Sequence, residues 1–308
     1  MSYVLGIDVS LWQDNISTPQ KMNFNKSYEE GVRFAFIKAS QRDFMDRDFI
    51  YNWDSAKRAG LLRGAYHFLT WDRSPKTQAK FFWSLLKEDS GELPAVLDFE
   101  YWGTVPSNAH NFAVEFYREF KSLTDKKLII YTGAYFWSKY APSNSPLYET
   151  DLWIASYTSQ EIMERNIKNL TKWKTWTFWQ FTDRLDGIKF GAESKQLDGN
   201  YFNGSLEDLY KYAGITIQKP EENQEQTSGS SIETPEQSIQ TNISLKVLKP
   251  VYAREIPYGK IVKTRQINEI IKLVDIYIEN EKRVWIKGDD NLWSALIYDN
   301  SLFFDKLN

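Results

Sequence analysis

Two hydrophobic patterns alternate along the first 214 residues. Short runs rich in Val, Ile, Phe and Tyr are separated by segments in which apolar residues recur at helical spacing. The runs predict eight strands, at 3–10, 32–40, 61–69, 93–100, 127–133, 151–157, 175–181 and, more weakly, 195–198. This alternation of strand and helix is typical of repeated β–α units around a mostly parallel sheet.

Three of the intervening segments predict helices. At Ser74-Pro75 a serine cap is followed by proline at the first helical position, which is a strong helix start. Segment 107–123 gathers its apolar residues on one helical face, and segment 47–59 predicts another helix. Eight strands with intervening helices indicate an α/β fold, an irregular TIM-like β/α barrel with short later helices and weak last strands.

The pattern changes after the barrel. From about 215 to 244, Glu, Gln, Ser, Thr and Pro dominate, and too few apolar residues remain to offset the entropy of ordering the chain. Segment 245–308 then shows short β-rich runs without helical periodicity, which is typical of a small all-β barrel or sandwich. We therefore predict a barrel domain at 1–214, a flexible linker at 215–244 and an all-β domain at 245–308.

Composition narrows the chemistry that the chain can perform. The absence of cysteine excludes disulfides and thiolate catalysis, and only two histidines, His67 and His110, are available for a metal site. A net charge of −3 favours neither nucleic acid nor anionic lipid as a partner. No apolar run approaches the ~20 residues of a membrane span, and residues 1–8 do not resemble a signal peptide. We expect no metal, no cofactor, no nucleic-acid partner and no membrane insertion.

Carboxylates occur at the ends of predicted strands, where parallel barrels place their working residues. Asp8 ends the first strand, Asp98 and Glu100 end the fourth, and Asp198 ends the last. Residues two apart on a strand share a face, about 6.6 Å apart along the chain, so Asp98 and Glu100 should face one site. Neighbouring carboxylates push their pKa values apart, and glycoside hydrolysis needs one protonated and one ionised carboxyl. The alternative is structural, with one acid capping a helix and the other paired to a base.

Aromatic residues make up 16% of the chain, and those near strand ends could stack on sugar rings. The candidate substrate-binding residues are Tyr66, His67, Tyr131, Trp153, Tyr157, Trp179 and Gln180. For any single ring, a place in the core is the alternative. His67 is either a buried, hydrogen-bonded imidazole or a polar wall of the site, whereas His110 is predicted to lie on the surface.

Eight motifs, in chain order, resemble those of glycoside hydrolase family 25. They are Gly6-Ile7-Asp8-Val9-Ser10 with Trp12-Gln13, Phe34 to Ser40, Gly64 to Phe68, Leu97-Asp98-Phe99-Glu100, Ile130-Tyr131-Thr132, Asp151 to Ala155, Trp179-Gln180-Phe181-Thr182, and Leu197 to Asn200 with Phe202. The resemblance covers about the first 213 residues. The chain departs from the family pattern at Ser40-Gln41-Arg42, which affects the rim of the site rather than its chemistry.

This resemblance implies a lysozyme-type muramidase that cuts the β-1,4 bond between N-acetylmuramic acid and N-acetylglucosamine in peptidoglycan. Glu100 then resembles the general acid, and Asp98 the partner that orients the substrate's acetamido group or stabilises positive charge. Asp8 and Asp198 resemble the flanking carboxylates of the site. Retention through the acetamide and inversion through a water both stay open, and we favour the first.

Residues 245–308 resemble a bacterial Src-homology-3-like cell-wall-binding domain, through Tyr252-Ala-Arg254, Pro257 to Lys260, Val284-Trp285 and Leu292-Trp293. Such a domain would hold the barrel near an insoluble polymer. The combination resembles a phage or prophage endolysin, made in the host cytoplasm without a signal peptide and acting on a Gram-positive wall. The alternatives are a secreted autolysin, another acetamido-sugar hydrolase such as a chitinase-like enzyme, and a non-catalytic wall-binding protein. The oligomeric state stays open.

Overall fold

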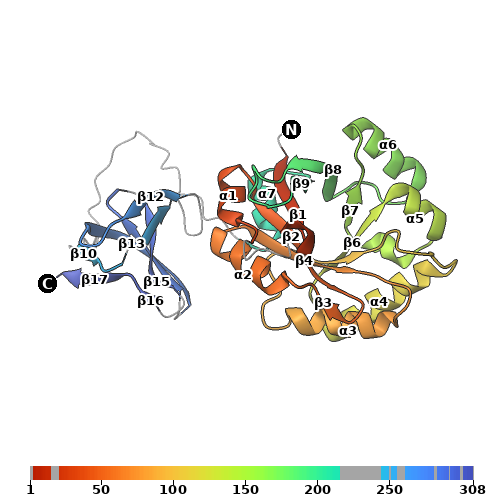
Figure 1. Cartoon of the computed structure of the whole chain (residues 1–308), viewed down its shortest axis with the longest axis horizontal. Coiled ribbons are helices and arrows are strands. Elements are labelled where there is room, and N and C mark those ends of the chain that lie inside the picture. Colours follow the sequence, from red (N-terminus) through yellow and green to blue (C-terminus); the bar gives the residue numbers. More distant parts are fainter. Residues whose placement is uncertain are drawn as a thin grey trace, which may run out of the picture. The chain divides into compact units, whose positions relative to one another are not determined.

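The computed structural model describes residues 3–14, 21–215, 244–249, 251–254, 261–280, 283–290, 292–298 and 301–307. The chain divides into two compact units, Met1–Gln218 and Lys219–Asn308 (Figure 1), and each is described here by itself. Apart from its two end residues, the predicted linker at 215–244 lies outside the described residues.

A closed ring of eight strands forms the centre of the first unit. The strands are β1 (Val4–Val9), β2 (Phe34–Gln41), β4 (Leu62–Phe68), β5 (Ala95–Asp98), β6 (Leu128–Gly133), β7 (Leu152–Ala155), β8 (Phe178–Asp186) and β9 (Gln196–Phe202). They pair in the order β1-β2-β4-β5-β6-β7-β8-β9, and β9 pairs again with β1 to close the ring. The predicted α/β barrel is therefore confirmed.

The eighth strand of the ring runs in the opposite direction to the others. Strands β1 to β8 of the ring are parallel, whereas β9 is antiparallel to both β8 and β1. The connection from β8 to β9 spans residues 187–195 and contains no helix, so it is too short for the crossover that a parallel pair requires. This reversal places the start of β9, rather than its end, beside the end of β1.

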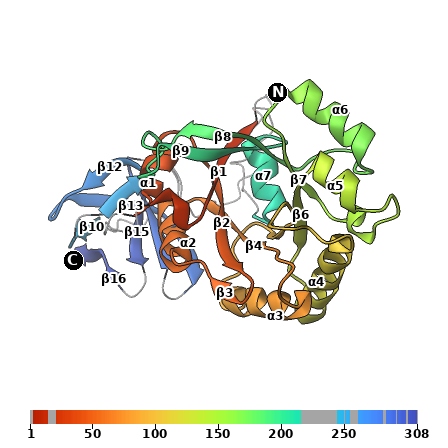
Figure 2. The same cartoon turned by 45° about the vertical axis from the view of Figure 1, so that its right-hand side comes forward.

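Most helices flank the ring of strands on its outside (Figure 2), whereas the last helix packs against residues of the barrel interior. The helices are α1 (Phe24–Glu29), α2 (Phe49–Ala59), α3 (Pro75–Leu86), α4 (Ala109–Leu123), α5 (Ala134–Tyr140), α6 (Gln160–Leu170) and α7 (Leu206–Tyr212), with the 3₁₀ turns η1 (Leu11–Gln13) and η2 (Pro146–Glu149). The three predicted helices correspond to α2, α3 and α4. Proline begins α3 as expected, but the Ser74 side chain makes no capping hydrogen bond. Among the described residues, no helix has both the length and the apolar character of a membrane span.

Side chains alternate along each strand between the barrel interior and the helix layer. The interior cluster includes Phe34, Phe36, Trp153 and Phe178, and Leu209 of α7 packs against the same cluster. A Cβ atom on Gly6 would lie 2.2 Å from the Phe34 ring, so the rings leave room only for glycine there. The lower barrel is thus filled by aromatic rings, and polar residues occupy the layer above it, at the carboxyl ends of the parallel strands.

The second unit contains β10 (Ser244–Val247), β11 (Val251–Arg254), β12 (Ile261–Arg265), β13 (Ile270–Asn280), β14 (Arg283–Gly288), β15 (Trp293–Tyr298), β16 (Ser301–Leu302) and β17 (Phe304–Leu307). Its described pairings are antiparallel. A separate apolar cluster, which includes Leu245, Val247 and Phe304, forms its core. The segment Pro257 to Lys260, part of the predicted resemblance, lies outside the described residues.

Candidate active site

The structure brings the four candidate carboxylates to one end of the barrel. Asp98 is the last residue of β5, and Glu100 follows it by two positions. Asp8 on β1 is directly opposite Asp198 on β9 in the antiparallel register. The charge of Asp8 acts on Asp98, Glu100 and Asp198, which shows that the four groups share one electrostatic environment.

The Asp98–Glu100 pair is arranged to retain a proton near neutral pH. Burial raises the pKa of Glu100 to about 7, and the charge of Asp8 acts in the same direction. Burial and the charge of Glu100 hold the pKa of Asp98 well above its usual range. Among the described residues, Asp98 Oδ1 is the single buried side-chain polar atom without a hydrogen-bond partner. A buried oxygen of this kind is costly unless a ligand supplies a donor.

Two side-chain amides fix the orientation of Asp8. Its Oδ2 atom accepts hydrogen bonds from Gln180 Nε2 at 2.8 Å and from Asn200 Nδ2 at 2.7 Å. Burial raises the pKa of Asp8 to about 6, although these two hydrogen bonds oppose the shift.

Aromatic residues in turn orient both amides. The Tyr131 and Tyr157 hydroxyls each donate to Gln180 Oε1 at 2.8 Å. Trp153 Nε1 donates to Asn200 Oδ1, also at 2.8 Å. Because the amide oxygens are occupied in this way, the amide NH₂ groups must point at Asp8, and the carboxylate is held in one position.

Asp198 differs from Asp8 in its protonation. Burial raises the pKa of Asp198 to about 9, and the neighbouring charges of Asp8 and Asp183 add to the shift. A hydrogen bond between the two carboxyls favours the proton on Asp198 and the charge on Asp8. At neutral pH the pair therefore carries one proton.

Lys38 also belongs to the site, although it is not among the site residues predicted from the sequence. Burial lowers its pKa, while the charges of Asp98, Asp46 and Glu100 oppose that shift. The sequence indicates the direction of this side chain, because Lys38 lies two residues after Phe36 and four after Phe34 on the same strand. Every second side chain of a strand lies on one face, and the Phe34 and Phe36 rings face the barrel interior. A lysine that continues an inward-facing row must reach the polar layer at the end of the barrel.

Five of the seven candidate substrate-binding residues lie at this end of the barrel or line its interior. Tyr66, Tyr131 and Trp153 belong to the interior cluster, and Gln180 donates to Asp8. Tyr157 is 53% exposed, so its ring is accessible from outside.

The structure corrects the assignment of His67. Its side chain is fully buried and points to the helix layer, where it stacks on Phe116, because its position alternates with that of the interior residue Tyr66. Its ring nitrogens lie 2.8 Å from Ser40 Oγ and 3.1 Å from Gln78 Oε1. Burial lowers the pKa of His67 to about 3. It is therefore the buried, hydrogen-bonded imidazole of the first alternative and does not line the site.

Two further positions are also corrected. Trp179 is 6% exposed and faces the helix layer, where its Nε1 donates to the Ser156 carbonyl at 2.7 Å. It alternates with the interior residues Phe178 and Gln180, so its ring does not reach a substrate in the barrel. His110, predicted to be on the surface, is buried at the start of α4, where its Nε2 lies 2.7 Å from Ser145 Oγ.

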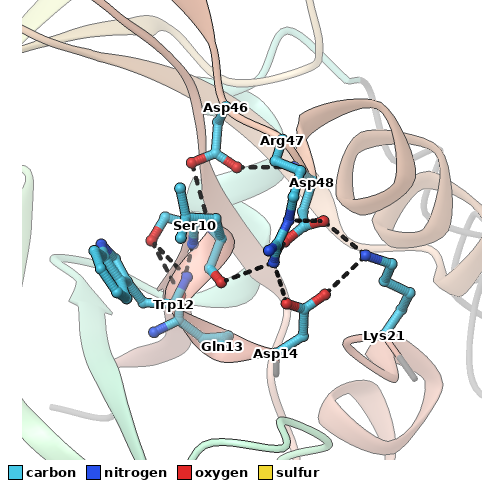
Figure 3. A network of polar contacts seen from close by, with 9 residues as sticks. Ser10, Trp12, Gln13, Asp14, Lys21, Asp46, Arg47 and Asp48 are labelled. Carbon is cyan, nitrogen blue, oxygen red and sulfur yellow. Dashed lines mark hydrogen bonds and ion pairs between the residues drawn. The ribbon is translucent and has the colours of Figure 1, made fainter. Parts of the chain in front are cut away.

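A network of polar contacts fixes the turn that follows β1 (Figure 3). The Ser10 backbone N–H donates to Gln13 Oε1 at 2.6 Å, which closes the turn η1 on itself. Asp46 Oδ2 accepts from the Leu11 N–H at 3.2 Å, and Arg47 pairs with Asp14 and with Asp48. The turn is consequently rigid.

The fold and these groups define the class of protein. A closed β/α barrel with two buried carboxyls at the end of one strand is an arrangement found in hydrolases. Among the described residues, no three His, Asp or Glu side chains are grouped as ligands of a metal ion.

The comparisons identify the family. The chain belongs to glycosyl hydrolases family 25, whose sequence model matches residues 7–187. It is 35% identical to YegX of Escherichia coli K12 over 220 residues, which cover 68% of this chain and 74% of YegX. It is 32% identical to Lysozyme M1 of Streptomyces globisporus over 234 residues, 70% of this chain and 73% of that protein. The bacterial lysozyme structure from Streptomyces coelicolor matches with a TM-score of 0.56 and 30% identity, covering 69% of this chain and 98% of that one.

Proposed function

We propose that the protein is an N-acetylmuramidase, a lysozyme that hydrolyses the β-1,4 bond between N-acetylmuramic acid and N-acetylglucosamine in peptidoglycan. The observation that carries the proposal is the Asp98–Glu100 pair, buried at the end of β5 beside Asp8. Family membership and the relative named Lysozyme M1 support the same substrate.

In this proposal Glu100 is the general acid. With a pKa raised to about 7, it still holds its proton in weakly acidic solution, where an ordinary glutamic acid is ionised. It gives this proton to the glycosidic oxygen as the bond from C1 to that oxygen breaks, and the bonding electrons stay on the leaving oxygen. Glu100 then acts as the base that takes a proton from the incoming water.

Asp98 is the partner that positions the acetamido group. Its Oδ1 atom has no hydrogen-bond partner in the protein, so it can accept the N–H of the substrate's acetamide. An acetamide held in this way turns its carbonyl oxygen toward C1, where it can form a bond as the leaving group departs. We therefore favour retention assisted by the substrate over inversion. Asp8 adds negative charge that stabilises the positive charge developing on the sugar.

Tyr66, Tyr131, Trp153 and Tyr157 complete the proposed substrate site. The first three line the barrel interior, and Tyr157 presents the most exposed ring of the four. The exposed ring of Tyr157 can bind the apolar face of a sugar, whereas the buried Tyr131 and Trp153 hold Gln180 and Asn200 in place beneath the site.

Product analysis tests the proposed specificity. Purified peptidoglycan is digested, the new reducing ends are reduced with borohydride, and the terminal sugar is identified. A muramidase yields reduced N-acetylmuramic acid. Reduced N-acetylglucosamine would instead show a glucosaminidase, and efficient cleavage of chitin oligomers would indicate a chitinase-like enzyme.

We also propose that the second unit is a Src-homology-3-like domain that binds the cell wall. Its described strands pair antiparallel around a core of their own, which is compatible with such a domain.

The biological role we propose is that of a phage or prophage endolysin, made in the cytoplasm of a Gram-positive host and acting on its wall. Expression in such a host should cause lysis only when a second protein opens the membrane, whereas a secreted autolysin would lyse without it.

A further inference from the structure

A pocket of about 210 Å³ opens beside the carboxylates, between the turn η1 and a small hairpin. The hairpin joins the end of β2 to the two-residue strand β3 (Phe44–Met45). Gln41 of β2 pairs with Phe44 of β3. The residues that line the pocket are Leu11, Lys38, Gln41, Arg42, Phe44, Met45 and Asp46. Lys38 connects it to the site, because the charges of Asp98 and Glu100 also act on this lysine.

The hairpin has an unusual backbone at the position where the chain departs from the family pattern. Arg42 has a φ of +57°, a region that residues other than glycine rarely adopt. Its guanidinium pairs with Asp72 at 2.8 Å and lies 4.9 Å from the centre of the Trp102 ring. Strained backbone held by specific contacts is often found at functional sites.

The opposite wall of the pocket is also preformed. The Leu11 N–H donates to Asp46 Oδ2, so the turn η1 and the residue after β3 are joined directly. Asp46 Oδ1 accepts from the Asp48 N–H at 3.0 Å, and Arg47 Nη2 donates to the Leu11 carbonyl at 3.4 Å. A ligand would therefore meet a pocket that is already built, and little binding energy would be lost in ordering its walls.

We propose that this pocket binds one pyranose ring of the glycan strand, next to the sugars joined by the bond that is cut. The proposal rests on the muramidase function proposed above. The volume lies below the roughly 300–1,000 Å³ of pockets that enclose drug-sized molecules, so it suits a single ring. Phe44 and Met45 are 59% and 41% exposed, and they offer an apolar surface to the face of a sugar.

The charges of the pocket favour a neutral ring over an acidic peptide stem. The Arg42 charge is already paired with Asp72, and Lys38 faces Asp46 as well as the catalytic carboxylates. Lys38 Nζ donates to Gln41 Oε1 at 2.9 Å, which leaves the Gln41 amide NH₂ to bind a sugar hydroxyl or an acetamide carbonyl. No unbalanced positive charge in the pocket would attract a carboxylate.

Binding without turnover provides the test. The ligand is a peptide-free hexasaccharide of alternating N-acetylglucosamine and N-acetylmuramic acid, and its affinity for full-length protein carrying Glu100→Gln is measured by calorimetry. Adding Phe44→Ala should weaken binding about tenfold, whereas Phe44→Tyr, which keeps the ring, should restore it. The matched control is Leu123→Ala, another exposed apolar side chain, at the far end of α4.

Two outcomes would overturn the proposal. Equal affinities for Phe44→Ala and Leu123→Ala would show that no sugar occupies the pocket. The same measurement is made with a hexasaccharide that carries stem peptides. If Phe44→Ala lowers the affinity for that ligand only, the pocket binds the peptide instead. Because this measurement requires no cleavage, it is independent of the product analysis, which alone decides the proposed muramidase function.

Discussion

Asp8 and Asp198 face each other across the antiparallel pair of β1 and β9. This contact exists because the last strand of the ring returns through a short connection instead of a crossover helix. Burial raises both pKa values, to about 6 for Asp8 and about 9 for Asp198. A reversed eighth strand therefore adds a protonated acid to the site, beside a charged one.

Replacing Asp198 by Asn should stabilise the protein at alkaline pH. The pKa of Asp198 in the folded state lies above its ordinary value of 3.8. Its contribution to stability is therefore complete below about pH 4 and is lost as the pH rises through about 9. We expect the melting temperature of Asp198→Asn, relative to wild type, to rise steadily from pH 5 to pH 9. Exposed Asp54→Asn on α2 is the control, and parallel curves for wild type and Asp198→Asn would contradict the assignment.

Replacing His67 by Asn should change acid stability and leave substrate binding intact. The folded-state pKa of about 3 lies below the ordinary 6.5, so the stability that His67 provides is present above pH 6.5 and is lost as the pH falls toward 3. The variant should lose about 1–3 kcal/mol at pH 7, because its shorter side chain leaves buried partners unpaired. It should also lose less stability than wild type between pH 6.5 and 4. A large rise in KM would instead place His67 in the site.

Replacing Gln180 by Met should damage both stability and catalysis. The change removes a donor to Asp8 and leaves the Tyr131 and Tyr157 hydroxyls without their acceptor. The Tyr131 hydroxyl is buried, and leaving it unpaired costs about 1–3 kcal/mol, whereas the more exposed Tyr157 can bind water instead. Denaturant unfolding should show this loss, and kcat should fall because Asp8 is no longer oriented. Gln196→Met, at an exposed position on β9, is the control, and an unchanged kcat for Gln180→Met would contradict the role of the network.

Ending the chain at Gly214 should separate wall binding from catalysis. The barrel has a core of its own and should fold without the second unit. Tethering raises the local concentration of an enzyme on an insoluble polymer. The shortened protein should therefore clear intact walls at least about tenfold more slowly, with an unchanged kcat on soluble oligosaccharides. Equal clearance rates would argue against a wall-binding role for residues 245–308.

Much of the barrel follows from the sequence because its signals are local. Each strand is an apolar run bounded by polar segments, and the inward position of Asp98 follows from the strand period of two. The strand ends at Asp98, two residues earlier than predicted, so Glu100 lies in the segment that follows it. The direction of β9 does not follow in this way. A weak run at 195–198 reads equally well as a parallel or an antiparallel strand, and only the ring closure with β1 decides between them.

The errors at His67 and Trp179 have a single physical cause. Both lie near strand ends, as site residues do, but the side chain of each lies on the face of its strand that points away from the barrel interior. The same period that places Asp98 in the interior also excludes these two side chains from it. Lys38 shows the opposite case, since it continues the interior row of Phe34 and Phe36 and could have been predicted from that phase.

The most direct test of the account is peptidoglycan clearance by wild type and by Glu100→Gln as the pH varies. Wild-type activity should fall as the pH rises through about 7, because Glu100 then loses the proton that it must donate. Below pH 7, where wild-type Glu100 holds its proton, Glu100→Gln should be slower by about 100-fold or more, and the difference should shrink as the pH rises above 7. Exposed Glu161→Gln on α6 should match wild type. Clearance by Glu100→Gln at the wild-type rate would contradict the central claim that Glu100 is the catalytic acid.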